Sequence, residues 1–339
     1  MTDESQFTNT STSLSTNNQQ QITNIFNSLV SVEGRVCFPC VPSMVEECSN
    51  AIANLVAGFG QPLSLEDRDR LRAGMAEFIK KGFEQSPLSQ LTIEYRPNKP
   101  PETGLFFEIE TVSPTPETGY QNWIQRRRTL GNRPDAKIAA IASDLEKSAS
   151  ILEIGGGRNG LALGRSGYKI EVVESVLEFA TELEVIAKRE ELFLSVKIGS
   201  IFDPVLRLRP AGFELAIASD FIPVCCRSLQ DIRLLLAKLC DGVKSGGLIV
   251  LGMFLVEEGG KPCDRIIELS QVRGCYFQTR SQLKEVMKDL PLTLLSDESF
   301  LEEETDLPKA LIHWASGRDL FPQNEERLLE FRWIIYQRI

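Results

Sequence analysis

The segment "ILEIGGGRNGLALGRSGYKIEVVES", Ile151–Ser175, decides the fold of this 339-residue chain. It begins with an apolar run and continues into three consecutive glycines. A short helical stretch follows, and a second apolar run, "KIEVVE" at 169–174, ends in an acid. A strand, a glycine turn, a helix and a second strand in this order predict a βαβ unit of a parallel sheet.

The same alternation continues toward the C-terminus. Strand-like runs recur at 192–200, 213–220 and 246–254, and helical stretches at 175–190 and 226–243 separate them. Strands that are apolar throughout are typical of a parallel sheet covered by helices on both faces. Two last strand-like runs, 292–299 and 331–338, complete the pattern. We therefore expect an α/β domain.

The composition changes along the chain, which predicts three parts. Residues 1–20 are rich in Ser, Thr, Asn and Gln and are expected to form a disordered leader. Residues 21–115 carry helical patterns and two strand-like runs, 91–97 and 105–112, and are interpreted as an accessory domain of helices plus a hairpin. Residues 116–339 are assigned to the α/β domain.

Charge and apolar patterning limit the classes of partner. The net charge is −10 and the pI about 5.0, which disfavours nucleic-acid binding because phosphates require clustered cations. No apolar run reaches the roughly 20 residues of a membrane helix, and the N-terminus lacks the pattern of a secretory signal. We expect a cytoplasmic protein with reduced thiols and no membrane partner. The sequence does not indicate an oligomeric state.

Cysteine spacing gives no metal site. The "CFPC" at 37–40 has C-x-x-C spacing, and Cys48 is near, but no second such pair follows and His313 is the one histidine. A structural zinc site needs four ligands, and a thioredoxin-like motif needs a strand and a helix around it. We interpret these cysteines as small buried residues near a turn and expect no metal.

The candidate site lies where the first strands end. Ligands of open parallel sheets bind at the carboxyl ends of the strands. Gly155, Gly156 and Gly157 lack a Cβ and allow a ligand to approach the backbone. Glu174 follows Gly155 by 19 residues, which is the place of a ribose-binding carboxylate. Glu153 precedes the glycines inside the strand, which distinguishes this loop from a bare G-x-G-x-x-G.

Five stretches then resemble the ordered motifs of class I S-adenosylmethionine-dependent methyltransferases: "ILEIGGG", "EVVES", "KIGSIFDP", "AIASDFIP" and "VKSGGLIVLGMF". The wording "GRNGLALGRSGYKIEVVE" is most similar to the tellurite-resistance branch, and "YQNWIQRRRTLGNRPDAKI" to the lead-in of bacterial, especially cyanobacterial, members. The resemblance covers about 120–339. It implies a Rossmann-like sheet of seven strands, the last one antiparallel, flanked by helices and preceded by the N-terminal, mainly helical extension with its hairpin.

The resemblance also implies site residues and a cofactor, S-adenosylmethionine. The cofactor-binding set is Glu153, Gly155, Gly156, Gly157, Glu174, Ser175, Ser200, Ile201, Ser219, Asp220 and Phe221. Substrate-side candidates from the lead-in are Tyr120, Trp123 and Arg127. Methyl transfer needs alignment more than protein-borne chemistry, so no universal catalytic residue is implied. Candidates for a catalytic group are Asp220, Tyr120 and His313. The implied activity is methyl transfer to an unidentified small molecule.

Other interpretations remain open at this point. Glu153 could cap local N–H groups, Glu174 could be a solvated strand end, and Tyr120 and Trp123 could pack in the core. The segment from Ile154 to Gly167 is about two residues shorter than is usual in the family, and Ser200 and Ser245 replace a common Asp and Pro. These departures motivate a second hypothesis, a non-catalytic binding or scaffold protein on a degenerate methyltransferase fold. A third, an NAD(P) oxidoreductase, is disfavoured by Glu153.

Overall fold

The computed structural model describes residues 33–60, 62–98, 105–114, 121, 133–256, 263–303, 309–316 and 329–339. The described residues divide into two compact units. The smaller unit takes those within Met1–Cys40, Met44–Gly82 and Gln90–Val112, and the larger takes those within Val41–Ser43, Phe83–Ser89 and Ser113–Ile339. The expected leader, 1–20, lies outside the described residues.

The smaller unit contains an antiparallel sheet in the order β1-β2-β3. Its strands are β1 (Gly34–Pro39), β2 (Gln90–Pro97) and β3 (Leu105–Val112), accompanied by helices α2 (Val45–Gly58) and α3 (Leu65–Gln85, of which the part up to Gly82 belongs to this unit). The 3₁₀ turn η1 (Pro42–Met44) lies at the boundary between the two units. The predicted hairpin is confirmed as β2 and β3, which pair antiparallel. Burial of Leu91 and Ile93 on β2, with Met75 and Ile79 on α3, forms the core of this unit.

The interpretation of the "CFPC" cysteines and Cys48 as small buried residues near a turn is wrong for Cys37, which is exposed, whereas Cys40 and Cys48 are buried. Cys37 lies in β1 and pairs with Thr92 of β2, so the motif sits at the end of a strand whose partner is far away in sequence. Burial and the neighbouring Cys48 raise the pKa of the Cys40 thiol to about 11, which keeps it protonated and unreactive at neutral pH. Among the described residues, no group of His, Cys, Asp and Glu is arranged to hold a metal ion.

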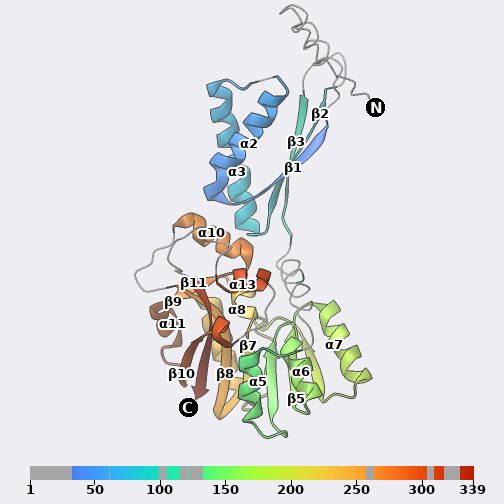
Figure 1. Cartoon of the computed structure of the whole chain (residues 1–339), viewed down its shortest axis with the longest axis vertical. Coiled ribbons are helices and arrows are strands. Elements are labelled where there is room, and N and C mark those ends of the chain that lie inside the picture. Colours follow the sequence, from blue (N-terminus) through green and yellow to red (C-terminus); the bar gives the residue numbers. More distant parts are fainter. Residues whose placement is uncertain are drawn as a thin grey trace, which may run out of the picture. The chain divides into compact units, whose positions relative to one another are not determined.

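The larger unit is built on one mixed sheet in the order β10-β11-β8-β7-β4-β5-β6 (Figure 1). The parallel strands are β4 (Ser150–Ile154), β5 (Lys169–Glu174), β6 (Leu194–Ile198), β7 (Phe213–Ala218) and β8 (Val243–Val256). β11 (Leu329–Arg338) runs antiparallel between β8 and β10 (Leu292–Ser299). The expected seven strands with an antiparallel last strand are confirmed, and the short β9 (Phe277–Thr279) adds an eighth beside β8.

Helices cover both faces of this sheet, as the apolar strands predict. One apolar cluster includes side chains from α5 (Ala136–Ser143), α6 (Arg158–Arg165), α7 (Leu177–Arg189), α12 (Phe300–Glu303) and α13 (Lys309–Ala315). The other includes side chains from α8 (Phe221–Cys225), α9 (Leu229–Gly242) and α11 (Arg280–Met287), while α10 (Asp264–Arg273) packs at the margin of the first. Figure 1 shows α7 near one end of the sheet and α11 with β10 near the other.

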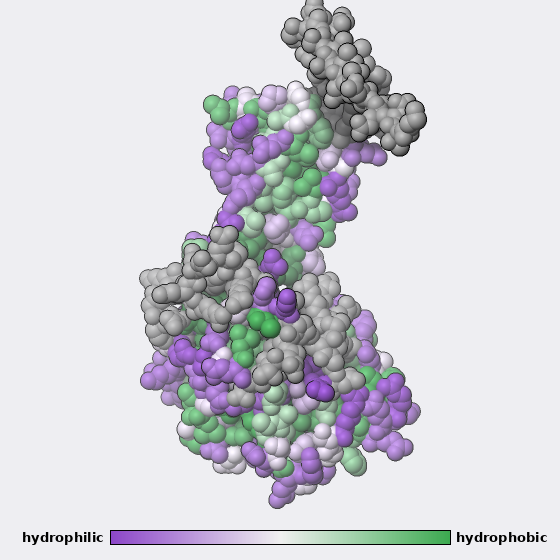
Figure 2. All heavy atoms as spheres, viewed as in Figure 1, coloured by the Kyte–Doolittle hydropathy of each residue, from purple (hydrophilic) through white to green (hydrophobic). Residues whose placement is uncertain are grey.

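The helices that cover the sheet have a hydrophilic outer side and an apolar inner side, as α7 illustrates. The surface over α7 is largely hydrophilic in Figure 2, whereas its inward residues Phe179 and Leu183 are buried. No helix in the described ranges is both long and apolar enough to traverse a bilayer. The burial of β4 on both faces fixes the carboxyl end of the strand, and with it the start of the glycine loop.

Candidate functional site at the carboxyl edge of the sheet

The glycine loop joins β4 to α6 in three residues, all with left-handed backbone. The φ angles of Gly155, Gly156 and Gly157 are 83°, 50° and 67°. Such angles are rare for residues with a side chain, so the loop requires glycine. A Cβ at Gly157 would also lie 2.6 Å from a methyl of Leu183 on α7. The short connection between strand and helix is therefore made by a run of left-handed glycines packed closely against α7.

Glu153 is a buried carboxyl that binds the start of α6. Its two oxygens accept the N–H groups of Asn159, at 3.2 Å, and Gly160, at 2.6 Å. The side chain is 4% exposed, and burial raises its pKa to about 7 although both N–H groups oppose that shift. The capping interpretation of Glu153 therefore describes its contacts: it satisfies backbone donors of the helix start that would otherwise be unpaired.

Glu174 closes the loop from the next strand. Its carboxylate accepts the N–H of Gly156 at 2.8 Å and the N–H of Val176 at 2.7 Å through different oxygens. The residue is 0% exposed, so it is not a solvated strand end. Glu174 thus lies where the βαβ pattern predicts an acid, directly beside the glycine loop, and in this state it is enclosed.

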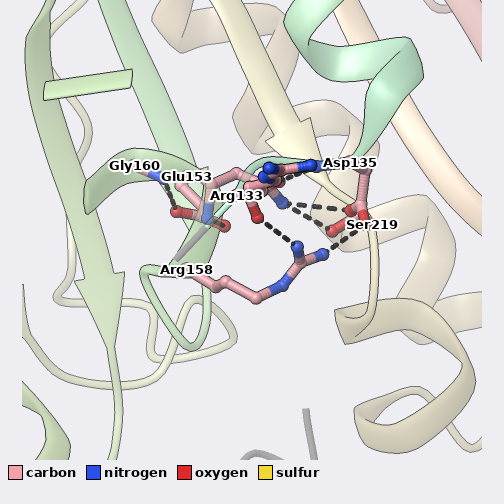
Figure 3. Close-up of polar contacts among 7 residues, drawn as sticks. Arg133, Asp135, Glu153, Arg158, Gly160 and Ser219 are labelled. Atoms are coloured by element: carbon pink, nitrogen blue, oxygen red, sulfur yellow. Dashed lines mark hydrogen bonds and ion pairs between the residues drawn. The ribbon is translucent and has the colours of Figure 1, made fainter. Parts of the chain in front are cut away.

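A polar network connects the segment before α5 with the glycine loop and β7 (Figure 3). Arg158 forms an ion pair with Asp135 and donates to the carbonyl of Arg133 at 2.8 Å. Asn159 accepts the N–H of Asp135 at 2.8 Å, and its amide nitrogen donates to the Asp135 carboxylate at 3.3 Å and to the Ser219 hydroxyl at 3.2 Å. Three separate parts of the chain are thereby fixed at the carboxyl edge of β4 and β7.

Among the described residues, the carboxyl groups of Asp135, Asp220 and Glu153 all act on Arg158. Burial opposes the charge of Arg158, but the carboxylates of Asp135 and Asp220 outweigh it and raise the pKa of the guanidinium. Its Nε is buried without a hydrogen-bond partner in the described structure. The single positive charge of Arg158 thus faces two carboxylates, Asp135 and Asp220, and a third carboxylate, Glu174, ends strand β5. Such a set suits a ligand that carries positive charge.

The other predicted site residues occupy different positions. Ser175 is exposed, Ser200 accepts the N–H of Phe202 at 3.2 Å, and Ile201 is buried in an apolar cluster. Ser219 and Asp220 follow β7 directly, and Phe221 starts α8 with its ring 5.5 Å from that of Phe202. The structure therefore brings Glu153, the glycines, Glu174 and Ser219 to one edge of the sheet.

For the substrate-side candidates and for His313, the structure describes no contact with the glycine loop or its carboxylates. Tyr120, Trp123 and Arg127 lie outside the described residues. His313 lies exposed on α13, and no described contact joins it to Glu153, Glu174 or Asp220.

Arg158 and Asn159 were not among the predicted site residues, and their contact with Asp135 was not predicted. Arg158 and Asn159 directly follow the glycines, so their position could have been suspected from sequence, but Asp135 lies 23 residues upstream of Arg158 and carries no local signal of this contact. Their contact depends on the fold, because it forms only when the segment before α5 is brought to the carboxyl end of β4.

Solved structures of similar fold are S-adenosylmethionine-dependent methyltransferases and relatives of that fold. A geranyl diphosphate C-methyltransferase from Streptomyces coelicolor A3(2), in complex with Mg²⁺, geranyl diphosphate and S-adenosyl-L-homocysteine, is 14% identical, with a TM-score of 0.46 over 60% of this chain and 79% of that one. A TehB-like methyltransferase from Corynebacterium glutamicum is 16% identical, with a TM-score of 0.43 over 66% and 100% of the two chains. The [4+2]-cyclase SpnF is 14% identical, with a TM-score of 0.43 over 60% and 80%.

These likenesses concern the fold alone. No protein-family model matches the chain, and comparison with curated protein sequences finds no match. Nothing in the comparisons supports the cyanobacterial branch suggested by the lead-in.

Proposed function

We propose that this protein is an S-adenosylmethionine-dependent methyltransferase that acts on a small molecule. The observation that carries the proposal is the meeting of the glycine loop and Glu174 at the carboxyl edge of a parallel sheet, with Gly156 bonded to Glu174 at 2.8 Å. This is the place where open α/β sheets bind nucleotides. Asp220 at the end of β7 adds a second carboxylate to the same edge.

The residues fit an adenosyl ligand if the Gly156 segment of the glycine loop moves. The Glu174 carboxylate accepts the N–H groups of Gly156 and Val176, and ribose hydroxyls would replace the Gly156 N–H as donors to this carboxylate. Because Glu174 is enclosed, the Gly156 segment must shift before a ribose can reach it. Gly155, Gly156 and Gly157 can supply that movement, since glycine adopts left- and right-handed backbone at little cost.

The chemistry divides between cofactor and protein. S-adenosylmethionine supplies an electrophilic methyl group when it is bound. The protein orients the ligands and excludes water from them. Asp135, Arg158 and Asn159 fix the segment before α5 against the glycine loop. Glu153 holds the start of α6. Glu174, Asp220 and Asp135 provide the negative charge that favours a cationic group at this edge. Residues 116–132, with Tyr120, Trp123 and Arg127, are proposed to complete the substrate side, and residues 21–115 to serve as the accessory domain.

Titration calorimetry on the folded, full-length chain tests this proposal. We expect saturable 1:1 binding of S-adenosylmethionine and S-adenosylhomocysteine and none of NAD⁺. Glu174→Gln should weaken that binding by about tenfold or more, because buried carboxylate hydrogen bonds contribute about 1.5–3 kcal/mol each. Glu171→Gln is the matched control: Glu171 lies on the same strand and pairs with Lys197 away from the glycine loop, so binding should be unchanged.

A non-catalytic binding or scaffold protein is the second candidate, and the enclosure of Glu174 favours it. In that case Glu174 serves to hold the glycine loop through contacts such as the Gly156 and Val176 hydrogen bonds, and the loop stays closed. A folded sample that binds neither S-adenosylmethionine nor S-adenosylhomocysteine would establish this alternative and reject the methyltransferase proposal.

A further inference from the structure

A cavity lies in the larger unit, between helix α11 and strand β10. Its volume is about 430 Å³, within the usual range of small-molecule sites. None of the candidate site residues lines it. The lining consists of Leu255, Arg280, Leu283, Lys284, Met287, Leu292, Leu294, Asp297, Ile334 and Tyr336.

Helix α11, which forms one wall of the cavity, is joined to α9 by hydrogen bonds. Arg233 on α9 donates to the carbonyls of Val286, at 2.6 Å, and Lys288, both at the end of α11. The strand on the other side departs from regular pairing, because the register of β10 with β11 shifts between Leu294 and Ser296. Such a bulge bends a strand and increases its twist. Leu255 of β8 and Ile334 and Tyr336 of β11 line the cavity between this helix and strand.

The bulge also separates two neighbouring leucines. Leu294 is paired with Tyr336, 54% exposed, and part of the cavity wall. Leu295 is 53% exposed, lies in the register shift and does not line the cavity. Leu294, Met287 and Leu292 give the cavity an apolar end, which would gain from covering by another apolar group.

Charges lie at the other end, and they do not cancel. Arg280 donates to Asp297 at 2.6 Å, and Arg332 is paired with both Asp297 and Glu330. These two arginines are balanced by two carboxylates. Lys284, one turn after Arg280 on α11, has no carboxylate partner in the described part of the chain. The lysine leaves one positive charge beside an apolar cavity.

We propose that this cavity binds a small anionic amphiphile. Its anionic head lies at Lys284 and Arg280, and its hydrocarbon part covers Met287, Leu292 and Leu294. The apolar wall supplies affinity by burial, and the unmatched ammonium selects an anion over a neutral or cationic head group. This inference is independent of the proposed methyltransferase activity, because no residue is shared between the two sites.

Decanoate, decanol and decylammonium, each below its micellar concentration, test the proposal by NMR or calorimetric titration of the full chain. We expect saturable 1:1 binding of decanoate, several-fold weaker binding of decanol and the weakest binding of decylammonium. Lys284→Glu should weaken decanoate binding several-fold and leave decanol binding unchanged, because it replaces the attraction of an exposed ion pair with repulsion.

The two leucines supply the matched variants. Leu294→Glu places a charge in the apolar wall and should weaken decanoate binding about tenfold or more, while Leu295→Glu, with the same exposure, should leave it unchanged. Both positions are more than half exposed, so both variants should fold, which circular dichroism checks. Absence of saturable decanoate binding, or equal losses in the two leucine variants, would overturn the proposal.

Discussion

At the residue scale, Glu153 and Arg158 are two buried ionisable groups in successive elements. The surroundings disfavour the charged form of Glu153 and favour the charged form of Arg158. Glu153 faces two backbone N–H groups, yet burial dominates and raises its pKa to about 7. Arg158 is paired with Asp135, a residue that is only 3% exposed. This pairing favours the charged form of the arginine. The consequences differ: Glu153 makes stability depend on pH, whereas Arg158 compensates a buried carboxylate.

Glu153→Gln should flatten the pH dependence of stability. The pKa of Glu153 is raised from 4.5 to about 7 in the folded chain, so its contribution is complete below about 4.5 and is lost as the pH rises through 7. A shift of this size corresponds to roughly 3 kcal/mol in the unfolding free energy. Urea denaturation of wild type and variant between pH 5 and 8.5 measures the difference. If the wild type loses no stability relative to the variant between pH 5 and pH 8.5, this assignment is refuted.

Arg158→Met should destabilise the fold by about 3–5 kcal/mol, because it leaves the buried Asp135 carboxylate without its ion-pair partner. Arg165→Met on the same helix is the control. Arg165 pairs with Glu190 nearer the surface, so its loss should cost about 1 kcal/mol or less. Chemical denaturation at pH 7 compares them, and equal losses would show that the Asp135 pair is not a special contact.

At the element scale, the glycines of α6 show how closely the helix packs on the sheet. A Cβ at Gly160 would lie 2.8 Å from a Glu153 oxygen and 2.9 Å from a methyl of Ile170. A Cβ at Gly164, one turn later, would meet Ile170 at an ordinary 3.6 Å. The first glycine is therefore required by the contact between α6 and β4, and the second is not.

Gly160→Ala and Gly164→Ala should consequently change stability in opposite directions. Overpacking at Gly160 should cost about 1–3 kcal/mol, while Gly164→Ala should gain about 0.5–1 kcal/mol from the lower entropy of the unfolded chain. Thermal or urea melts of the two variants provide the measurement. A stabilised Gly160→Ala variant would mean that α6 can move away from β4.

Local patterns were sufficient to predict most elements of the larger unit. The apolar runs at 151–155, 169–174 and 213–220 correspond to β4, β5 and β7, because strands buried on both faces are apolar throughout. Strand β1 was missed, since "GRVCFP" has little periodic pattern and its partner β2 lies more than 50 residues later. Long-range pairing of this kind depends on the fold and leaves a weak local signal.

At the scale of the whole molecule, the site was predictable where it follows from sheet topology. The carboxyl ends of β4, β5 and β7 lie together in a parallel sheet, and the glycines, Glu174 and Ser219 therefore converge as expected. The Asp135–Arg158 pair was not predictable, because it joins segments that only the complete fold brings together. The enclosure of Glu174 by Gly156 was equally beyond the sequence, since it depends on the path of three left-handed glycines.

The central claim is that the carboxyl edge of β4, β5 and β7 is a binding site for S-adenosylmethionine. A crystal structure of the full chain with S-adenosylhomocysteine tests it most directly. We predict that the ligand lies at this edge, with the ribose hydroxyls within hydrogen-bonding distance of Glu174 and the Gly156 N–H displaced from that carboxylate. A ligand bound elsewhere on the chain, or a saturated crystal in which Gly156 and Glu174 remain joined and the edge holds no ligand, would contradict the claim.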